Sequence, residues 1–121
     1  MSSPTQRSKL FLIQNGYAVD ICEHYDMFAH KRRDLFHMFD LVAIKDGVTG
    51  VLGVQTTTGS NASARLHKVM GNPTTSLWLS TGNTIKIHGW RKLAKRKENK
   101  LWHVRITDLK LQDGRLISVT S

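Results

Sequence analysis

Residues 38–57, with the sequence MFDLVAIKDGVTGVLGVQTT, decide how this chain folds. The run at about 38–45 is apolar on both sides apart from Asp40, which is typical of a strand in the middle of a sheet. Asp-Gly follows at 46–47 and indicates a hairpin turn. A second apolar run follows at about 51–57. The stretch therefore predicts two neighbouring strands, with Asp40 near the start of the first.

The polar residues of these two strands are expected to meet. Side chains alternate between the two faces of a strand, so Gln55 and Thr57 point the same way. Pairing of the two strands brings this face next to Asp40. We therefore predict that an aspartate and a glutamine lie side by side on adjacent strands, at a cationic cleft.

The remainder of the chain predicts helices and further strands around this pair. Ser3 is expected to cap the first helix, which should bury Leu10 and Ile13. Helices are predicted at 4–14, at about 62–70 and, in a short form, from Pro73 to Gly82. Further strands are predicted from Tyr17 to about Glu23, at 84–91 and at 101–109, and residues 116–119 form either an edge strand or a tail. This order predicts one α/β domain over residues 1–121, with a mixed sheet flanked by helices.

The charge of the chain favours a polyanionic partner. Its 121 residues hold 18 Lys and Arg against nine Asp and Glu, a formal net charge of +9. Six of the nine acids lie between residues 20 and 46, and none lies from 47 to 97. Carboxylates that bind a metal ion, followed by cations that bind a phosphate backbone, suit a protein that acts on phosphodiesters. Nucleic acid is therefore expected, rather than a neutral small molecule.

The basic residues expected to contact nucleic acid form two clusters and a few single positions. One cluster precedes the Asp40 strand, and the other fills the connection between the last two predicted strands. Trp90 and Trp102 are near the second cluster and are candidates to stack on unpaired bases. Contacts of this kind position a backbone and read little sequence, so structure-selective or nonspecific binding is expected. The candidates are Lys31, Arg32, Arg33, Arg65, Lys86, Arg91, Lys92, Lys95, Arg96 and Lys97.

Several other classes of site find little support in the sequence. The single cysteine, Cys22, cannot form an internal disulfide, which favours a reducing, intracellular setting. None of the six histidines has a zinc spacing, and His88 and His103 are expected on polar strand faces, in contact with phosphate or with solvent. No apolar run has the length of a membrane span, so a soluble, cytoplasmic protein is expected.

The order of elements, Asp40 in FDLVAI and the strand VLGVQTT resemble the PD-(D/E)xK nuclease superfamily, specifically its small Holliday-junction-resolvase-like and VRR-type nucleases. The resemblance covers about residues 4–92. It implies a restriction-endonuclease-like core and endonuclease activity on DNA, including branched DNA, with Mg²⁺ or Mn²⁺ as cofactor. A homodimer and a phage origin also fit the resemblance.

The resemblance also implies which positions form the site. In that family a Glu on the first helix, an Asp and an E-x-K motif converge on the metal ion. The matching positions here are Gln6, Asp40, Gln55 and Thr57, and Asp40 alone has the usual residue. Asp40 would hold the ion, and Gln55 would ligate it through its carbonyl or orient a metal-bound water. Thr57 cannot replace the ammonium of the motif.

Two further acids and one lysine are candidates to supply the missing charges. Mg²⁺ usually takes one or two carboxylates with waters and substrate phosphates, so Glu23 or Asp34 would add the second carboxylate. Alternatively, Glu23 pairs with a nearby arginine. Lys68 would offset charge in the transition state, or it belongs with Arg65 to a solvated helix face. The catalytic candidates are Asp40, Gln55, Thr57, Glu23 and Lys68, and the metal-binding candidates are Asp40, Gln55 and Glu23.

Three functions are consistent with these observations. The first is a divergent Mg²⁺-dependent endonuclease that hydrolyses DNA. The second is a catalytically inactive nucleic-acid-binding or assembly protein of the same fold. The third is a basic RNA-binding protein with an unrelated α/β fold.

Overall fold

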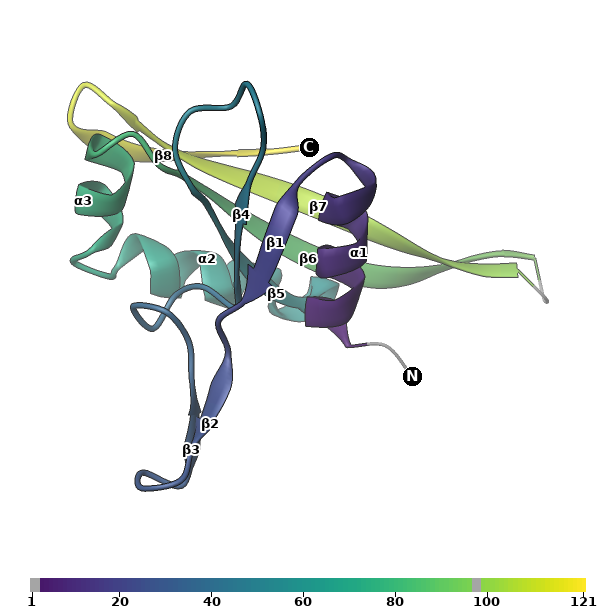
Figure 1. Ribbon diagram of the computed structural model, residues 1–121. Helices are drawn as coiled ribbons and strands as arrows, with labels where there is room; N and C mark the ends of the chain where they lie inside the picture. The colour runs from purple at the N-terminus through teal and green to yellow at the C-terminus, as the bar shows by residue number, and fades with distance from the viewer. Residues whose placement is uncertain (1–2, 97–98) are drawn as a thin grey trace.

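A mixed six-stranded sheet forms the centre of the computed structural model (Figure 1). The structure describes residues 3–96 and 99–121, and at 94–96, 99 and 100 it describes the backbone alone. The elements are α1 (Pro4–Gln14), β1 (Ala18–Ile21), β2 (His24–Asp26), β3 (Lys31–Arg33), β4 (Leu41–Ile44), β5 (Leu52–Thr58), the 3₁₀ helix η1 (Gly59–Asn61), α2 (Ala62–Met70), α3 (Thr75–Ser80), β6 (Thr84–Arg96), β7 (Asn99–Gln112) and β8 (Arg115–Thr120).

The strands of the main sheet are arranged in the order β1-β4-β5-β6-β7-β8. All neighbours are antiparallel except β5 and β6, which run parallel and are joined by η1, α2 and α3. The predicted α/β class with one mixed sheet is therefore confirmed. The final segment is an edge strand rather than a tail.

The predicted hairpin of β4 and β5 is present. Leu41 pairs with Val54 across it, and Gly47 and Gly50 adopt φ of +81° and +84° in the connection. Positive φ costs glycine little, because it has no Cβ. Asp40 precedes Leu41 and donates its N–H to the carbonyl of Val54 at 2.9 Å. The register therefore brings Asp40 beside Gln55, which follows Val54.

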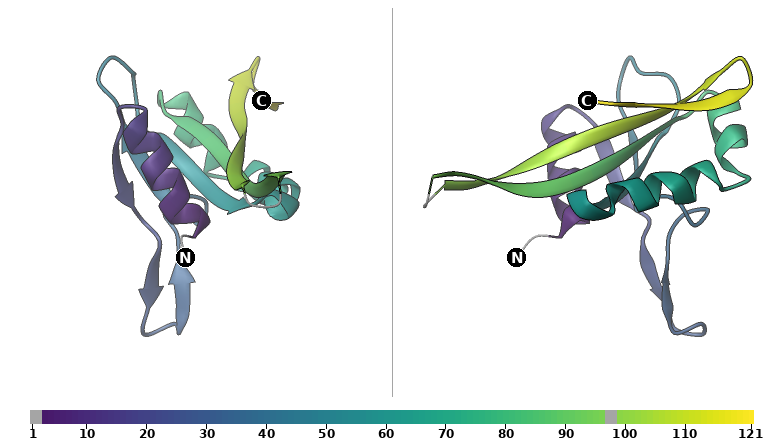
Figure 2. Two further views of the ribbon diagram at one scale, coloured as in Figure 1. Left: turned by 90° about the vertical axis from the view of Figure 1, so that its right-hand side faces the viewer. Right: turned by 180° about the vertical axis from the view of Figure 1, so that it is seen from behind.

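Helices cover both faces of the sheet (Figure 2). On one face α1 packs on a cluster of buried residues, and on the other face α2 and α3 cover a second cluster. The first cluster consists of Leu12 of α1 with Leu41, Ala43, Leu52 and Val54. The second consists of Val69 of α2 with Met38, Phe39, Ile85, Ile87 and Leu109. No α-helix in the described part of the chain is long and apolar enough to cross a lipid bilayer.

Two hairpins extend away from this core (Figure 1). β2 and β3 form a small sheet of their own, in a segment where the sequence analysis predicted a basic cluster but no strand pair. The predicted loop at 91–100 is instead largely strand, because β6 and β7 continue past the edge of α1. Both hairpins carry basic residues of the two clusters.

The predicted buried face of α1 is wrong. Leu10 and Ile13 are exposed, whereas Ser8 and Leu12 are buried. Residues 10–13 are all apolar, so their spacing does not select one face. The Ser8 hydroxyl decides the orientation, because it lies 2.8 Å from Nε1 of Trp90 and 2.9 Å from Nδ1 of His88. Hydrogen bonding to His88 and Trp90 of β6 thus accounts for a serine in the core.

Candidate functional site

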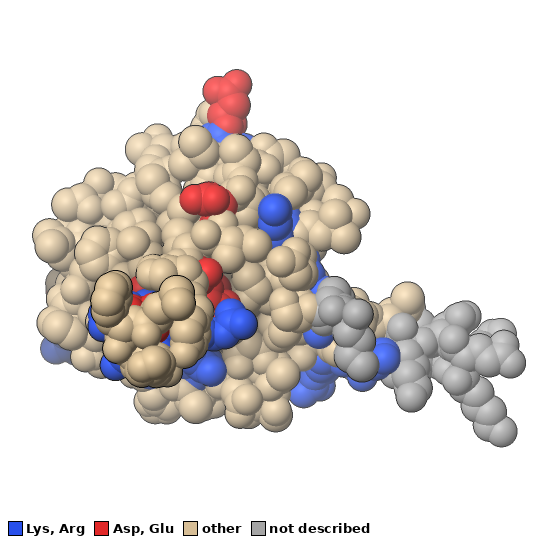
Figure 3. Space-filling model, turned by 60° about the horizontal axis from the view of Figure 1, so that its bottom comes forward, with Lys and Arg blue, Asp and Glu red and all other residues tan. Residues whose placement is uncertain are grey.

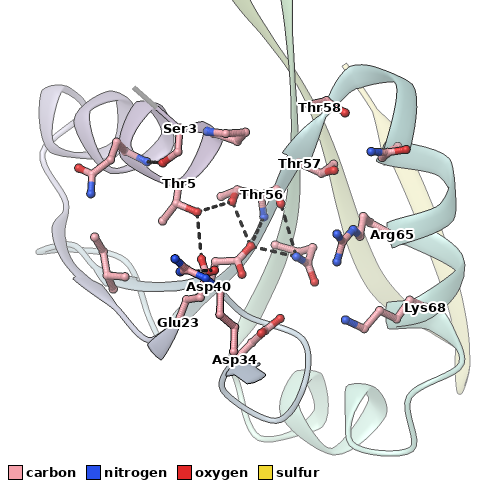
Figure 4. A pocket seen from close by; sticks show the side chains of 16 residues that line it. Ser3, Thr5, Glu23, Asp34, Asp40, Thr56, Thr57, Thr58, Arg65 and Lys68 are labelled. Carbon is pink, nitrogen blue, oxygen red and sulfur yellow. Dashed lines mark hydrogen bonds and ion pairs between the residues drawn. The ribbon is translucent and has the colours of Figure 1, made fainter. Parts of the chain in front are cut away.

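A pocket of about 740 Å³ opens beside the start of β4 and the end of β5, between the first turns of α1 and α2 (Figure 4). All five catalytic candidates, Asp40, Gln55, Thr57, Glu23 and Lys68, contribute to its lining. So do Gln6, Asp34, Arg32 and Arg65. The structure therefore brings together residues that lie far apart in the sequence.

Asp40 and Gln55 are in direct contact at the floor of the pocket. Oδ2 of Asp40 accepts three hydrogen bonds, from Nε2 of Gln55 at 2.9 Å, from the N–H of Thr56 at 2.8 Å and from Oγ1 of Thr56 at 3.0 Å. Asp40 is 6% exposed and Gln55 is 1% exposed. The predicted adjacency of the aspartate and the glutamine is present.

Burial controls the ionisation of Asp40. Loss of solvent raises the pKa of its carboxyl from the usual 3.8 to about 6, and the negative charges of Asp34 and Glu23 act in the same direction. The hydrogen bonds from Thr56 oppose this rise. The N–H and the hydroxyl of Thr56 stabilise the carboxylate form, and burial disfavours it. Asp40 is therefore ionised at neutral pH but becomes protonated in mild acid.

The side chain of Gln55 has one satisfied end and one unsatisfied end. Its amide nitrogen donates to Asp40, and its carbonyl oxygen Oε1 is buried without a hydrogen-bond partner among the described residues. Buried carbonyls usually have a partner, so this oxygen can accept a bond from a group that enters the pocket. An amide also suits this position better than a glutamate, which would place a second carboxylate beside Asp40.

Glu23 is held by its own partners. Its Oε1 forms an ion pair with Arg32 at 2.9 Å, and Thr5 of α1 donates to its Oε2 at 3.4 Å. The hydroxyl of Thr5 also lies 2.9 Å from that of Thr56, which in turn contacts Asp40. A chain of hydroxyls therefore links the two carboxylates (Figure 4). Of the two alternatives for Glu23, the structure shows the arginine pair.

The opposite wall of the pocket is cationic. Arg65 and Lys68 extend from α2 towards the side on which Asp34 and Asp40 lie (Figure 4). Neither takes part in an ion pair within the described part of the chain. Lys68 thus lies on an exposed helix face and also lines the pocket. These two cations are available to a bound anion.

The donors in the pocket suit a hard cation. Its lining offers carboxylate, amide and hydroxyl oxygens, and none of the described residues that line it is a cysteine or a histidine. Mg²⁺ and Mn²⁺ prefer such oxygens, whereas zinc sites use histidine and cysteine. The described residues contain no group of three His, Cys, Asp or Glu side chains that could hold a metal. Asp40 and the unpaired Oε1 of Gln55 are the oxygens that would hold a Mg²⁺ ion here, with water and phosphate as its remaining ligands.

The other candidate nucleic-acid contacts are spread over several surfaces. Lys31, Arg32 and Arg33 lie on β3, where Arg33 also pairs with Asp26 at 2.6 Å. In Figure 3, basic side chains flank this hairpin as it points towards the viewer, and acidic atoms lie close behind it. Arg32 of this cluster lines the pocket.

The second cluster is described only in part. Arg91 and Lys92 are exposed on β6. The side chains of Lys95 and Arg96 are not described, and Lys97 lies outside the described residues. Lys86 is not among the residues that line the pocket, and it forms an ion pair with Asp108 at 2.8 Å.

The prediction that His88 lies on a polar face is wrong. The side chain is fully buried, so it cannot contact phosphate or solvent. Its burial lowers the pKa of the imidazole to about 4. Trp90 is buried as well, whereas Trp102 is exposed, with Arg7 stacked 3.5 Å from its ring centroid. Only Trp102 of these two tryptophans remains a candidate for base stacking.

Sequence analysis missed two threonines of the site. Thr56 supplies two of the three donors to Asp40, and Thr5 joins Glu23 to it. The sequence analysis gave Thr56 no part in the site, although its position beside Gln55 places its N–H near Asp40. Nothing in the spacing of α1 singles out Thr5.

The chain has no significant match among protein-family models, curated proteins or solved structures. The function is therefore argued from the pocket and its surroundings.

Proposed function

We propose that this chain is a DNA-binding protein with a restriction-endonuclease-like core that hydrolyses DNA phosphodiester bonds as a divergent Mg²⁺-dependent endonuclease. One observation carries the proposal, the convergence of Asp40, Gln55 and Asp34 opposite Arg65 and Lys68 in a single pocket. A phosphodiesterase needs this combination of oxygen ligands for a cation and positive charge for the phosphate.

Each wall of the pocket has its own task in this proposal. Asp40 and the carbonyl of Gln55 hold the cation, and Asp34 adds negative charge nearby. When bound, Mg²⁺ supplies Lewis-acid activation of the phosphate and of a water molecule. Arg65 and Lys68 bind the phosphate oxygens and offset the charge that grows on them in the transition state.

The surroundings of the pocket support DNA as the substrate. The basic hairpin β2–β3 borders the pocket through Arg32, and exposed cations continue along β6. Cations of this kind bind the phosphate backbone and give affinity that depends strongly on salt. The same contacts carry little sequence information, so we infer selection by DNA shape. The lone Cys22, a free thiol, fits an intracellular setting.

A second candidate function is DNA binding without cleavage. Two observations favour it: Oδ2 of Asp40 is already saturated by three protein donors, and Glu23 is neutralised by Arg32. In that case Gln55 remains hydrogen-bonded to Asp40, and the pocket binds a phosphate without cleaving the phosphodiester bond.

Cleavage assays with Asp40→Asn separate the two functions. We expect the wild-type protein to nick plasmid DNA and branched DNA in Mg²⁺ or Mn²⁺, and the variant to lose at least about a thousandfold of this rate. Binding should persist, because the substitution removes no cation. The matched control is Asp113→Asn in the exposed turn between β7 and β8, which should cleave normally.

Three outcomes would redirect or contradict the proposal. DNA binding by the wild-type protein without cleavage in either metal supports the second function. Preference for single-stranded RNA over duplex DNA in a competition assay supports an RNA-binding protein instead. Equal cleavage by the wild type and Asp40→Asn contradicts the assignment of this pocket as the site.

A further inference from the structure

The β2–β3 hairpin exposes large apolar side chains at its tip. Phe28 is 99% exposed and Met27 is 76% exposed. Both lie in the turn between the strands, at the point farthest from the core (Figure 1). Large apolar side chains gathered at a projecting tip are unfavourable in water and commonly mark a binding site.

The turn is built to hold this tip in one conformation. Asp26 Oδ1 accepts hydrogen bonds from the N–H of Phe28 at 2.9 Å and from that of Ala29 at 3.1 Å. The other oxygen of Asp26 pairs with Arg33 on the opposite strand. His30 closes the turn with φ of +52°. A flexible loop would let the two side chains fold back, whereas these bonds favour their projection.

The root of the hairpin is attached to the pocket. The carbonyl oxygen of Asp40 accepts the N–H of Cys22 at 2.8 Å and that of Glu23 at 3.3 Å. Arg32 lines the pocket from the second strand of the hairpin. A molecule held by the hairpin is therefore placed beside the phosphate pocket by direct backbone contacts.

The hairpin also carries positive charge beside its apolar tip. Lys31 is exposed, and no ion pair among the described residues involves it. Arg32 is paired with Glu23, yet its side chain remains 71% exposed. Cations beside an apolar wedge are the combination with which DNA-bending proteins bind phosphates and part a base step. These two side chains, even with Tyr25, which is 55% exposed on β2, are too few for a stable protein–protein interface, which needs roughly 800 Å² from each partner.

We propose that Met27 and Phe28 insert between bases of DNA at a branch or other weakly stacked step, while Lys31 binds the adjacent phosphate. This inference rests on the DNA-binding part of the proposed function and is independent of cleavage. Unstacking is least costly where the stack is already interrupted, so the hairpin gives the protein a preference for branched DNA over continuous duplex.

The test uses 2-aminopurine, whose fluorescence rises when it is unstacked, placed at the centre of a four-way junction. In metal-free buffer, we expect the wild-type protein to raise the fluorescence. The double variant Met27→Ala, Phe28→Ala should lose this rise and bind the junction about tenfold more weakly, the equivalent of losing one base-stacking contact. Its binding should keep the same salt dependence, because no charge is removed.

Three further variants make the test specific. Leu77→Ala removes an apolar side chain that is 62% exposed on α3, away from the hairpin, and should behave as wild type. Phe28→Trp should keep the fluorescence rise, since the wedge remains aromatic. Lys31→Ala should keep the rise and reduce the slope of log affinity against log salt by about one.

The failure of this inference can be told from the failure of the proposed function. A double variant that retains the fluorescence rise and the junction affinity overturns the wedge and leaves cleavage untouched. A fluorescence rise without any cleavage in Mg²⁺ supports the wedge and contradicts the nuclease. A wild-type dimer that the double variant converts to a monomer in sedimentation assigns the tip to a second copy of the chain and overturns the inference.

Discussion

The two walls of the pocket differ in how their charges are neutralised. On the acidic wall, Asp40 is held by Gln55 and Thr56, and Glu23 is held by Arg32. On the opposite wall, Arg65 and Lys68 have no ion-pair partner within the described part of the chain. Asp40 and Glu23 are thus satisfied internally, whereas Arg65 and Lys68 are left to an external anion. Under the proposed function, the second wall would bind a phosphate, and the first wall would bind a cation only if Asp40 shared its carboxylate between the cation and its protein donors.

Gln55→Glu disturbs the internally satisfied wall most strongly. The variant loses the donor to Asp40 and places a second carboxylate beside a buried one, so one of the two must take a proton. We expect the free energy of unfolding at pH 8 in EDTA to fall by about 3 kcal/mol, and Mg²⁺ to restore part of it. Urea denaturation measures both effects. Gln14→Glu at the end of α1 is the exposed control, and equal stability of both variants would contradict the role of Gln55.

Arg65→Ala and Lys68→Ala test the open wall. Each removes a cation that faces the pocket, so cleavage should fall about a hundredfold while the fold remains intact. The single-turnover rate at which nicked plasmid forms measures this change, and thermal unfolding checks the fold. Lys110→Ala on β7 is the matched control outside the pocket. If cleavage is lost equally in the control, the open wall has no special role.

The raised pKa of Asp40 predicts that the free energy of unfolding depends on pH. The folded pKa is about 6, above the value of about 4 for an unfolded aspartate, so the folded protein binds the proton more tightly. The resulting stabilisation is complete below about pH 4 and is lost as the pH rises through 6. It amounts to about 3 kcal/mol. Asp40→Asn should remove this dependence in urea denaturation between pH 4 and 7.5, and a parallel pH profile in the variant contradicts it.

The centre of the site could be predicted because it depends on local pairing. A short connection between two apolar runs fixes the register of β4 and β5, and the period of two then places Asp40 beside Gln55. The position of Lys68 followed similarly from a helix directly after β5. The direction of the Gln55 amide could not be predicted, since it depends on whether the nitrogen or the oxygen faces Asp40.

Features that depend on distant contacts could not be predicted from spacing. Thr5 reaches Glu23 and Thr56 only because α1 crosses the sheet at the right angle. The burial of Ser8 instead of Leu10 depends on partners about 80 positions away in the chain. The β2–β3 hairpin has few apolar residues to indicate a strand pair, and Asp26, which stabilises its turn, resembles any surface acid.

The parallel pairing of β5 with β6 has a consequence for the order of folding. Strands β6, β7 and β8 follow one another in the sequence and form a meander, and β4 and β5 form a hairpin. Leu52, however, pairs with Thr84 across the whole helical connection, and closing such a loop is slow compared with forming a hairpin. We expect the hairpin and the meander to form early and to pair with each other late. The wall that carries Arg65 and Lys68 belongs to that connection, so it acquires its position only when the halves of the molecule meet.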